Sequence, residues 1–109
     1  MPFNAKCLML PAACFAFITS LNAQAASDAN TVTIKNFNFA PMQMVVRAGT
    51  TVTWRNADEE PHTVTSESGV FRSGAVDGGE SYSFKFSKPG TYKYVCSIHP
   101  QMVGTIIVK

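Results

Sequence analysis

A run of seven residues near the carboxyl end constrains the fold of this chain more than any other feature. Between Cys96 and Met102 (CSIHPQM), a thiol, an imidazole and a thioether recur at every third residue. Residues 91–95 alternate before the cysteine, and residues 103–108 form an apolar run after the methionine. Each of these patterns predicts a strand. We therefore expect the three side chains in a tight loop between two strands, at one end of a sheet.

The donor atoms of this loop indicate which metal it would bind. Thiolate and thioether favour copper over hard cations, and one Cys, two His and a weakly held Met define the blue-copper electron-transfer site. The second imidazole has one candidate, because the chain holds two histidines and the other is His62, directly after Pro61. The sequence therefore predicts a site for one copper ion made by His62, Cys96, His99 and Met102.

Taken one at a time, these residues have blander interpretations. Cys96 would be a small buried hydrophobe, His62 a loop histidine with satisfied hydrogen bonds, and Met102 a core side chain. A Cys-x2-His pair also suggests zinc, but structural zinc sites use four Cys or His ligands and residues 26–109 offer three. The combination of spacing, second histidine and strand pattern favours copper over each of these.

The amino-terminal segment has the three parts of a secretory signal peptide. Lys6 supplies the charge, residues 7–18 form the apolar run, and Ala23-Gln24-Ala25 is a small-residue cleavage site. A membrane anchor is the rival interpretation, but the run is shorter than the roughly 20 residues of a spanning helix. We predict a signal peptide over residues 1–25, a soluble periplasmic domain over residues 26–109, and no membrane insertion.

Removal of this signal would leave Cys96 as the one cysteine of the mature chain, because Cys7 and Cys14 precede the cleavage site. Cys96 would then have no partner for an internal disulfide. An unpaired thiol in an oxidising compartment is either buried and inert or held by a metal. Its neighbour His99 favours the metal.

The remainder of the chain reads as short strands separated by turn residues, without a helical period. The aromatic pair Phe37 and Phe39, which ends the first strand, is expected to face a core. So many short strands, with no room for crossover helices, predict an antiparallel sandwich or barrel. The expected strands are residues 31–35, 42–47, 50–56, 62–66, 70–73, 80–86, 91–95 and 103–109.

Charge excludes some classes of partner. The chain of 109 residues has a formal net charge of +2, and one of its lysines, Lys6, leaves with the predicted signal. No basic stripe of the kind that binds nucleic acid is present. We therefore expect no nucleic-acid partner and no anionic-membrane partner, and we expect a monomer.

The ligand pattern resembles that of the cupredoxins, the small blue copper proteins, and most of all the amicyanins, whose loop has the same short C-x2-H-x2-M form. Residues 51–54 (TVTW), followed by Pro61 and His62, are also similar to amicyanins. The resemblance covers essentially all of residues 26–109. It implies a Greek-key β-sandwich and reversible one-electron transfer between Cu(I) and Cu(II). The implied ligands are His62, Cys96, His99 and, as the weak axial ligand, Met102.

Three positions beside these ligands differ from amicyanins. Ile98, Gln101 and Thr63 stand where amicyanins have Pro, Phe and Asn. By analogy, the backbone N–H of Thr63 should point at the Cys96 sulfur, and a change of its side chain should matter less than a change of its backbone.

The resemblance also suggests where partners dock. His99 would present its ring edge through an apolar rim of Met42, Pro61, Ile98 and Pro100. Residues 58–60, which are all acidic, form either a solvated loop or a patch that steers a basic partner. Methylamine dehydrogenase and a c-type cytochrome are candidate partners, alongside other periplasmic donors and acceptors.

Three functions account for this pattern to different degrees. The leading one is a soluble periplasmic electron carrier that is not an enzyme. The second is a periplasmic protein that stores or delivers copper. The third is a Cys/His hydrolase, which lacks the helix that commonly activates a cysteine nucleophile and leaves Met102 unexplained.

Overall fold

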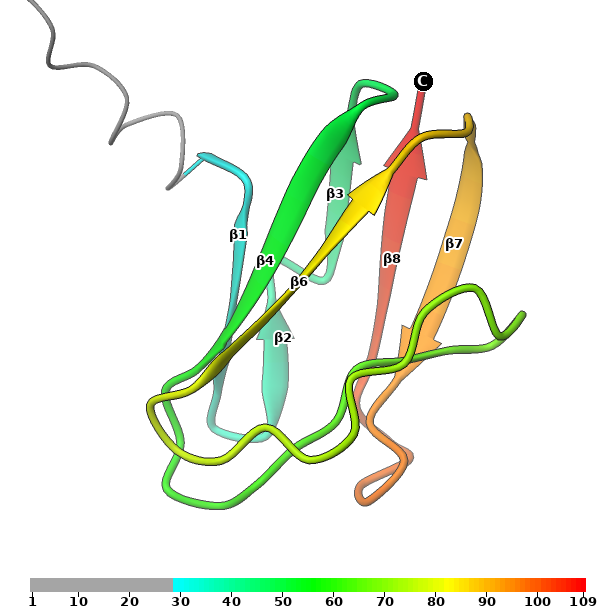
Figure 1. Ribbon diagram of the computed structural model, residues 1–109. Helices are drawn as coiled ribbons and strands as arrows, with labels where there is room; N and C mark the ends of the chain where they lie inside the picture. Colours follow the sequence, from blue (N-terminus) through cyan, green and yellow to red (C-terminus); the bar gives the residue numbers. More distant parts are fainter. Residues whose placement is uncertain (1–28) are drawn as a thin grey trace, which may run out of the picture.

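Two four-stranded sheets form the body of the chain in the computed structural model, which describes residues 29–109 (Figure 1). The predicted β-sandwich is confirmed, and the expected strands 31–35 and 50–56 coincide with the observed ones. The strands are β1 (Thr31–Lys35), β2 (Asn38–Ala40), β3 (Gln43–Val46), β4 (Thr50–Asn56), β5 (Thr65–Ser66), β6 (Ser81–Phe86), β7 (Gly90–Val95) and β8 (Val103–Val108).

The strand order is β2-β1-β4-β6 in one sheet and β3-β8-β7-β5 in the other. The pairs β1–β4 and β3–β8 are parallel, so the expectation of an entirely antiparallel sandwich is wrong. Parallel neighbours need a long connection. Between β1 and β4 the chain passes through β2 and then β3, which lies in the other sheet, and this detour supplies the length.

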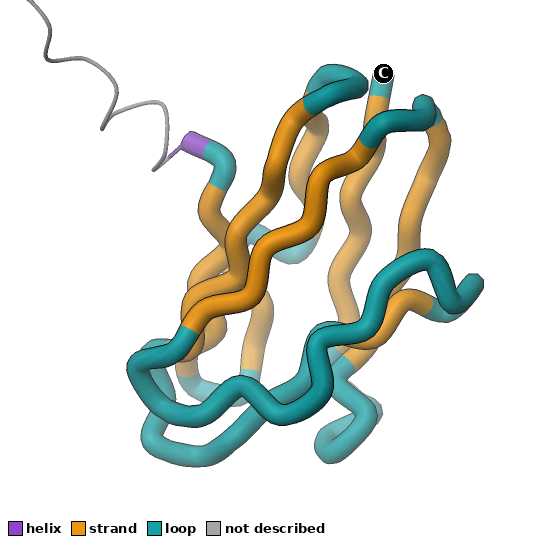
Figure 2. The backbone as a smooth tube through the Cα atoms, viewed as in Figure 1, coloured by secondary structure: helices purple, strands orange, loops and turns teal. Residues whose placement is uncertain are grey.

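The segment between β4 and β6 is mostly loop, with only the short β5 within it (Figure 2). The expected strands 62–66 and 70–73 are therefore wrong in extent. Isolated bridges pair His62 with Val76 and Thr65 with Arg72. The side chain of Ser73 takes part as well, because its hydroxyl accepts the Val64 N–H at 2.8 Å. Outside β5, which pairs with β7, this segment is held by pairing with itself rather than by pairing within a sheet.

Aromatic rings fill much of the space between the sheets. Trp54 of β4 and Tyr94 of β7 are both 0% exposed, with ring centroids 5.4 Å apart. Gly104 of β8 lies opposite Tyr94 in the register. A Cβ atom at Gly104 would overlap the Tyr94 ring at Cζ and the hydroxyl oxygen, so this glycine provides the room that the ring occupies.

The turn between β1 and β2 departs from the sequence expectation for Phe37. The chain reverses at Asn36 and Phe37, which have φ angles of 54° and 60°, and Lys35 pairs with Asn38. Phe39 is buried as expected, but Phe37 lies at the turn and is 37% exposed. The prediction that both face the core is wrong, because Phe37 lies in the turn that ends the alternation of β1.

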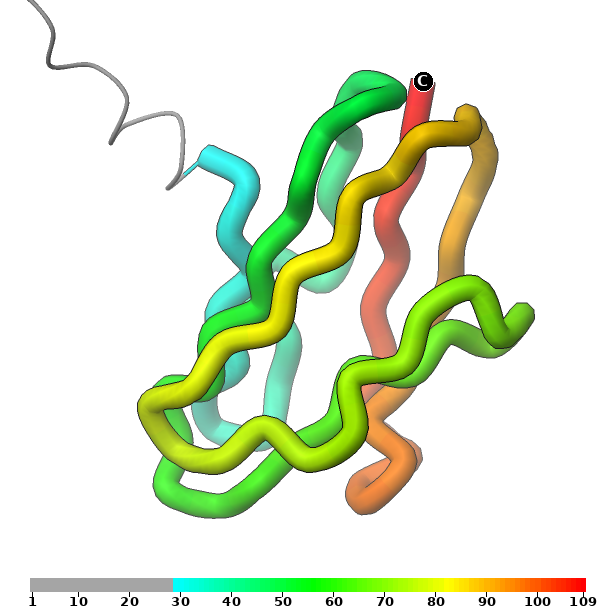
Figure 3. The backbone as a smooth tube through the Cα atoms, viewed as in Figure 1, coloured from blue at the N-terminus to red at the C-terminus, as the bar shows by residue number. Residues whose placement is uncertain are grey.

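Three connections meet at the end of the sandwich opposite the carboxyl terminus. Figure 3 shows the β1–β2 turn, the loop that follows β4 and the loop between β7 and β8 at this common end. Connections that are far apart in the sequence thus lie together at one end of the sandwich. The predicted copper ligands lie on the second and third of these connections.

The predicted signal peptide, residues 1–25, and the boundary at residue 26 lie outside the described residues. Within residues 29–109, no helix has the length and apolar character needed to cross a membrane. Cys96, the cysteine of this part of the chain, is buried and unpaired.

Candidate metal centre

The structure brings His62, Cys96 and His99 together. One ligand atom from each side chain lies within 4.8 Å of the others. The Cys96 sulfur is 3.8 Å from Nδ1 of His62 and 3.7 Å from Nδ1 of His99. Two imidazole nitrogens therefore face one sulfur from two separate connections.

Backbone hydrogen bonds shape the loop that carries two of these residues. The Cys96 N–H donates to the Met102 carbonyl at 3.1 Å, and the Met102 N–H donates to the His99 carbonyl at 2.9 Å. The His99 N–H in turn donates to the Cys96 carbonyl at 3.2 Å. These bonds join residues that are three or six positions apart. They fold the run into a tight turn whose side chains share one side.

Met102 closes this loop directly before β8. Met102 is only 2% exposed and belongs to the buried core cluster that also contains Cys96. An inward-facing thioether at this position suits a weak ligand that water does not reach.

His62 is positioned from the other connection. It is 0% exposed, and its backbone exchanges two hydrogen bonds with Val76, at 3.0 Å and 2.7 Å. This isolated bridge fixes the backbone beside the ring. The ring nitrogens then have different neighbours, since Nδ1 faces the sulfur and Nε2 faces a carboxylate.

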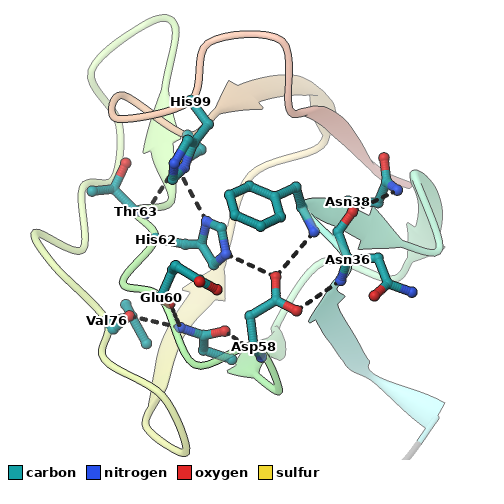
Figure 4. Close-up of polar contacts among 11 residues, drawn as sticks. Asn36, Asn38, Asp58, Glu60, His62, Thr63, Val76 and His99 are labelled. Atoms are coloured by element: carbon teal, nitrogen blue, oxygen red, sulfur yellow. Dashed lines mark hydrogen bonds and ion pairs between the residues drawn. The ribbon is translucent and has the colours of Figure 1, made fainter.

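That carboxylate is Asp58, whose Oδ2 lies 2.9 Å from Nε2 of His62 (Figure 4). The same side chain accepts the backbone N–H groups of Asn36 at 2.7 Å and Phe37 at 3.0 Å. Desolvation alone would raise its pKa, but these two N–H groups and His62 together hold the pKa of Asp58 below its ordinary value of 3.8. Asp58 is therefore an anion that accepts the His62 N–H and leaves Nδ1 free to bind a metal.

Asn56 and Gly78 both contact the backbone of Asp58. The Asn56 Oδ1 accepts the Asp58 N–H at 2.9 Å, while its Nδ2 donates to the carbonyls of Glu60 at 2.8 Å and Val76 at 2.9 Å. A Cβ at Gly78 would lie 2.8 Å from the Asp58 carbonyl oxygen. The loop that carries the Asp58 carboxylate is thus packed closely against the backbone at Gly78.

Backbone N–H groups and two imidazole rings surround the Cys96 sulfur. Burial would raise the pKa of its thiol, but the Thr63 N–H at 3.3 Å, both imidazoles and the His99 N–H lower it to about 6. The thiolate, which is the form that binds metals, therefore prevails at neutral pH. The expected contact between the Thr63 N–H and the sulfur is confirmed.

The side chain of Thr63 has a role that the sequence did not suggest. Its hydroxyl oxygen accepts the Ser97 N–H at 2.7 Å and lies 2.9 Å from the Ser97 hydroxyl. It also lies 3.1 Å from the Thr65 hydroxyl. Thr63 therefore joins the His62 segment to the Cys96 loop through its side chain as well as its backbone.

The donor set and its spacing fit a copper ion. Metal bonds of about 2.0 Å to nitrogen and about 2.3 Å to sulfur, meeting at about 120°, would place those ligand atoms about 3.7 Å apart. The observed separations are 3.7 Å and 3.8 Å. A thiolate with two imidazoles is a set that suits copper. One ion therefore fits between the three side chains with little movement.

His99 is the ligand candidate that reaches the surface, since it is half-buried whereas His62 and Cys96 are buried. Its neighbours Ile98 and Pro100 are exposed, as are Met42 and Pro61. The residues of the expected apolar rim are therefore accessible to a partner.

Sequence reasoning missed two residues at this site, Asp58 and Phe37. Asp58 was grouped with Glu59 and Glu60 as a solvated or steering loop, yet its side chain is only 9% exposed, while Glu59 and Glu60 are exposed. Three consecutive acidic residues carry no signal that singles out the first.

Comparison with known proteins identifies the family. A family model described as a cupredoxin-like domain matches residues 8–108. The chain belongs to the cupredoxins. Amicyanin-alpha of Methylorubrum extorquens is 35% identical to this cupredoxin in an alignment of 91 residues that covers 79% of this chain and 76% of that protein. The amicyanin of Paracoccus denitrificans is 35% identical in an alignment of 92 residues that covers 80% of this chain and 70% of that protein.

Solved structures agree with this assignment. A copper(I) form of an amicyanin variant superposes on this cupredoxin with a TM-score of 0.71 at 31% identity, covering 75% of this chain and 83% of that chain. As a cupredoxin, the chain is a copper protein that carries electrons between redox proteins and is not an enzyme.

Proposed function

We propose that this cupredoxin holds one copper ion with His62, Cys96, His99 and Met102, and that it carries single electrons between redox partners in the periplasm. The observation that supports this most directly is the convergence of both Nδ1 atoms on the Cys96 sulfur, at 3.8 Å and 3.7 Å. Copper bound there supplies a one-electron couple between Cu(I) and Cu(II).

The protein's contribution is to hold these side chains still. Asp58 orients the His62 ring, and the N–H and hydroxyl of Thr63 fix the sulfur and its loop. Because both supports are hydrogen bonds made by the protein itself, they restrain the His62 ring and the Cys96 sulfur. A site that moves little has little reorganisation to undergo in each transfer.

Electron exchange with a partner would pass through His99. Its ring is half-buried, and the residues of the expected apolar rim, Met42, Pro61, Ile98 and Pro100, are exposed. A redox protein that docks on this apolar rim would bring its own centre near the copper. Methylamine dehydrogenase and a c-type cytochrome are the first candidates, because the relatives include amicyanins, and other periplasmic carriers are the alternative.

Export is the second part of the proposal. The pattern of residues 1–25 supports a signal peptide cleaved after about Ala25, which leaves residues 26–109 as a monomeric cupredoxin domain. Mass spectrometry of the protein recovered from a periplasmic fraction should give an amino terminus at Ala26. An uncleaved chain in the cytoplasm would contradict this part and leave the copper assignment untouched.

An absorption spectrum tests the copper proposal. Purified protein loaded with Cu(II) should show an intense visible thiolate-to-copper band that Cys96→Ala removes, together with reversible voltammetry. The matched control is Ser97→Ala, which alters the neighbouring residue and keeps the sulfur. Colourless protein that binds only Cu(I) would instead indicate copper storage or delivery.

A further inference from the structure

The ring of Phe37 packs on both histidines of the site. Its centroid lies 5.1 Å from that of His62 and 4.8 Å from that of His99, and the ring planes meet at 89° and 83°. We propose that Phe37 is a positioning residue, which restrains the His99 ring in the geometry that copper requires. The inference rests on the proposed role of His62 and His99 as ligands.

The backbone of Phe37 is held in an unusual conformation to present this ring. Its φ angle is 60°, in a region where bulky residues are genuine outliers and which glycine or asparagine normally fills in two-residue turns. Such a conformation persists only where the surrounding structure enforces it, and it gathers at functional sites. A phenylalanine therefore occupies this position although its positive φ is unfavourable for a bulky residue.

One carboxylate enforces the conformation and serves the metal site as well. Asp58 accepts the N–H groups of Asn36 and Phe37 at 2.7 Å and 3.0 Å, and its Oδ2 lies 2.9 Å from Nε2 of His62 (Figure 4). The turn and the His62 ring are thus fixed to the same group. The backbone of Phe37 is consequently placed relative to His62 through a shared carboxylate.

His99 has more need of this restraint than His62. Nε2 of His62 is hydrogen-bonded to Asp58, whereas Nε2 of His99 has no hydrogen-bond partner within residues 29–109. His99 also lies on a surface loop and is half-buried. Edge-to-face packing between aromatic rings is favourable and directional. The Phe37 ring therefore provides for His99 the orientation that a hydrogen bond provides for His62.

Two glycine variants separate the ring from the turn. Phe37→Gly removes the ring and relieves the positive φ, so folding should survive, and Asn36→Gly relieves the neighbouring positive φ while keeping the ring. Both keep the N–H that donates to Asp58. In the metal-free protein, NMR relaxation of the His99 ring should show greater ring motion in Phe37→Gly than in Asn36→Gly and wild type. Equal ring motion in all three would overturn the proposal.

Metal release provides a second readout. Removal of Cu(II) by excess EDTA should be about tenfold faster from Phe37→Gly than from Asn36→Gly. This ratio corresponds to a difference of about 1.4 kcal/mol in the activation free energy of copper release. Phe37→Leu, which is apolar but not aromatic, should fall between them. Equal rates would contradict the role of Phe37. Absence of copper binding in wild type would instead contradict the proposed function, while the NMR comparison would still report on the packing.

Discussion

Asp58 accepts a hydrogen bond from His62 on the ring nitrogen that faces away from the Cys96 sulfur, at 2.9 Å. Carboxylates in this position fix the tautomer and orientation of a metal-binding histidine, and their loss commonly lowers metal affinity by about 10–100-fold. We expect Asp58→Ala to lower Cu(II) affinity within that range, measured by competition with a chelator.

Glu59→Gln is the matched control for Asp58→Ala. It removes a charge from the adjacent, exposed position and should leave the affinity within about twofold of wild type. If both variants weakened binding equally, general electrostatics rather than the contact with His62 would be responsible.

Thr63→Val should destabilise the metal-free protein. The substitution keeps the size of the side chain but leaves the Ser97 N–H, now bonded at 2.7 Å, without its acceptor. This hydrogen bond is partly buried and Ser97 is exposed, so its loss should cost about 0.5–1.5 kcal/mol, and denaturant unfolding should show a loss of this order. Thr63→Ser, which keeps the hydroxyl, should lose less than half as much. Equal losses would mean that the methyl group, and not the hydrogen bond, matters.

Gly104→Ala should be strongly destabilising for a different reason. The new methyl group would overlap the ring of Tyr94, which is 0% exposed, and overpacking of a core typically costs about 1–3 kcal/mol. Thermal unfolding of Gly104→Ala in the wild-type and Tyr94→Leu backgrounds forms a double-mutant cycle. The glycine substitution should be less harmful beside leucine, and strictly additive effects would argue against the overlap.

The stability of the metal-free protein should depend on pH through Cys96. The folded pKa is about 6 and the ordinary value is 9.0, so between these values the unfolded chain binds one more proton than the folded chain. The free energy of unfolding should therefore rise as pH increases from 6 to 9, and this stabilisation should be lost as pH falls through 6. Cys96→Ser should lack this part of the slope. Parallel pH profiles for the two proteins would contradict the lowered pKa.

Local patterns in the sequence were sufficient for most of the sandwich. Alternation and turn residues located β1 and β4 at their observed bounds, because the burial of one sheet face imposes that alternation. They could not reveal the turn at Asn36 and Phe37. That turn lacks glycine and depends on Asp58, which is 22 and 21 positions away. A tertiary contact here overrides the local preference.

For the candidate site, the sequence predicted the ligand residues but not the contacts that support them. The spacing of Cys96, His99 and Met102 placed these residues on one short loop, because a loop of three-residue steps returns to its starting point. The supporting contacts of Asp58 and the Thr63 hydroxyl could not be read, since they join residues 4 and 34 positions apart without any motif.

The loop from Cys96 to Met102 is closed by its own backbone hydrogen bonds, whereas the contacts of His62 come from Asp58 and Val76. Within residues 29–109, the hydrogen bonds that join these two halves without a ligand imidazole are made by the hydroxyl and the N–H of Thr63. The centre is therefore modular in construction. A ligand loop of another length could be grafted between β7 and β8 with His62 left in place. The graft would have to retain a backbone N–H, at the position of Ser97, that donates to the Thr63 hydroxyl oxygen.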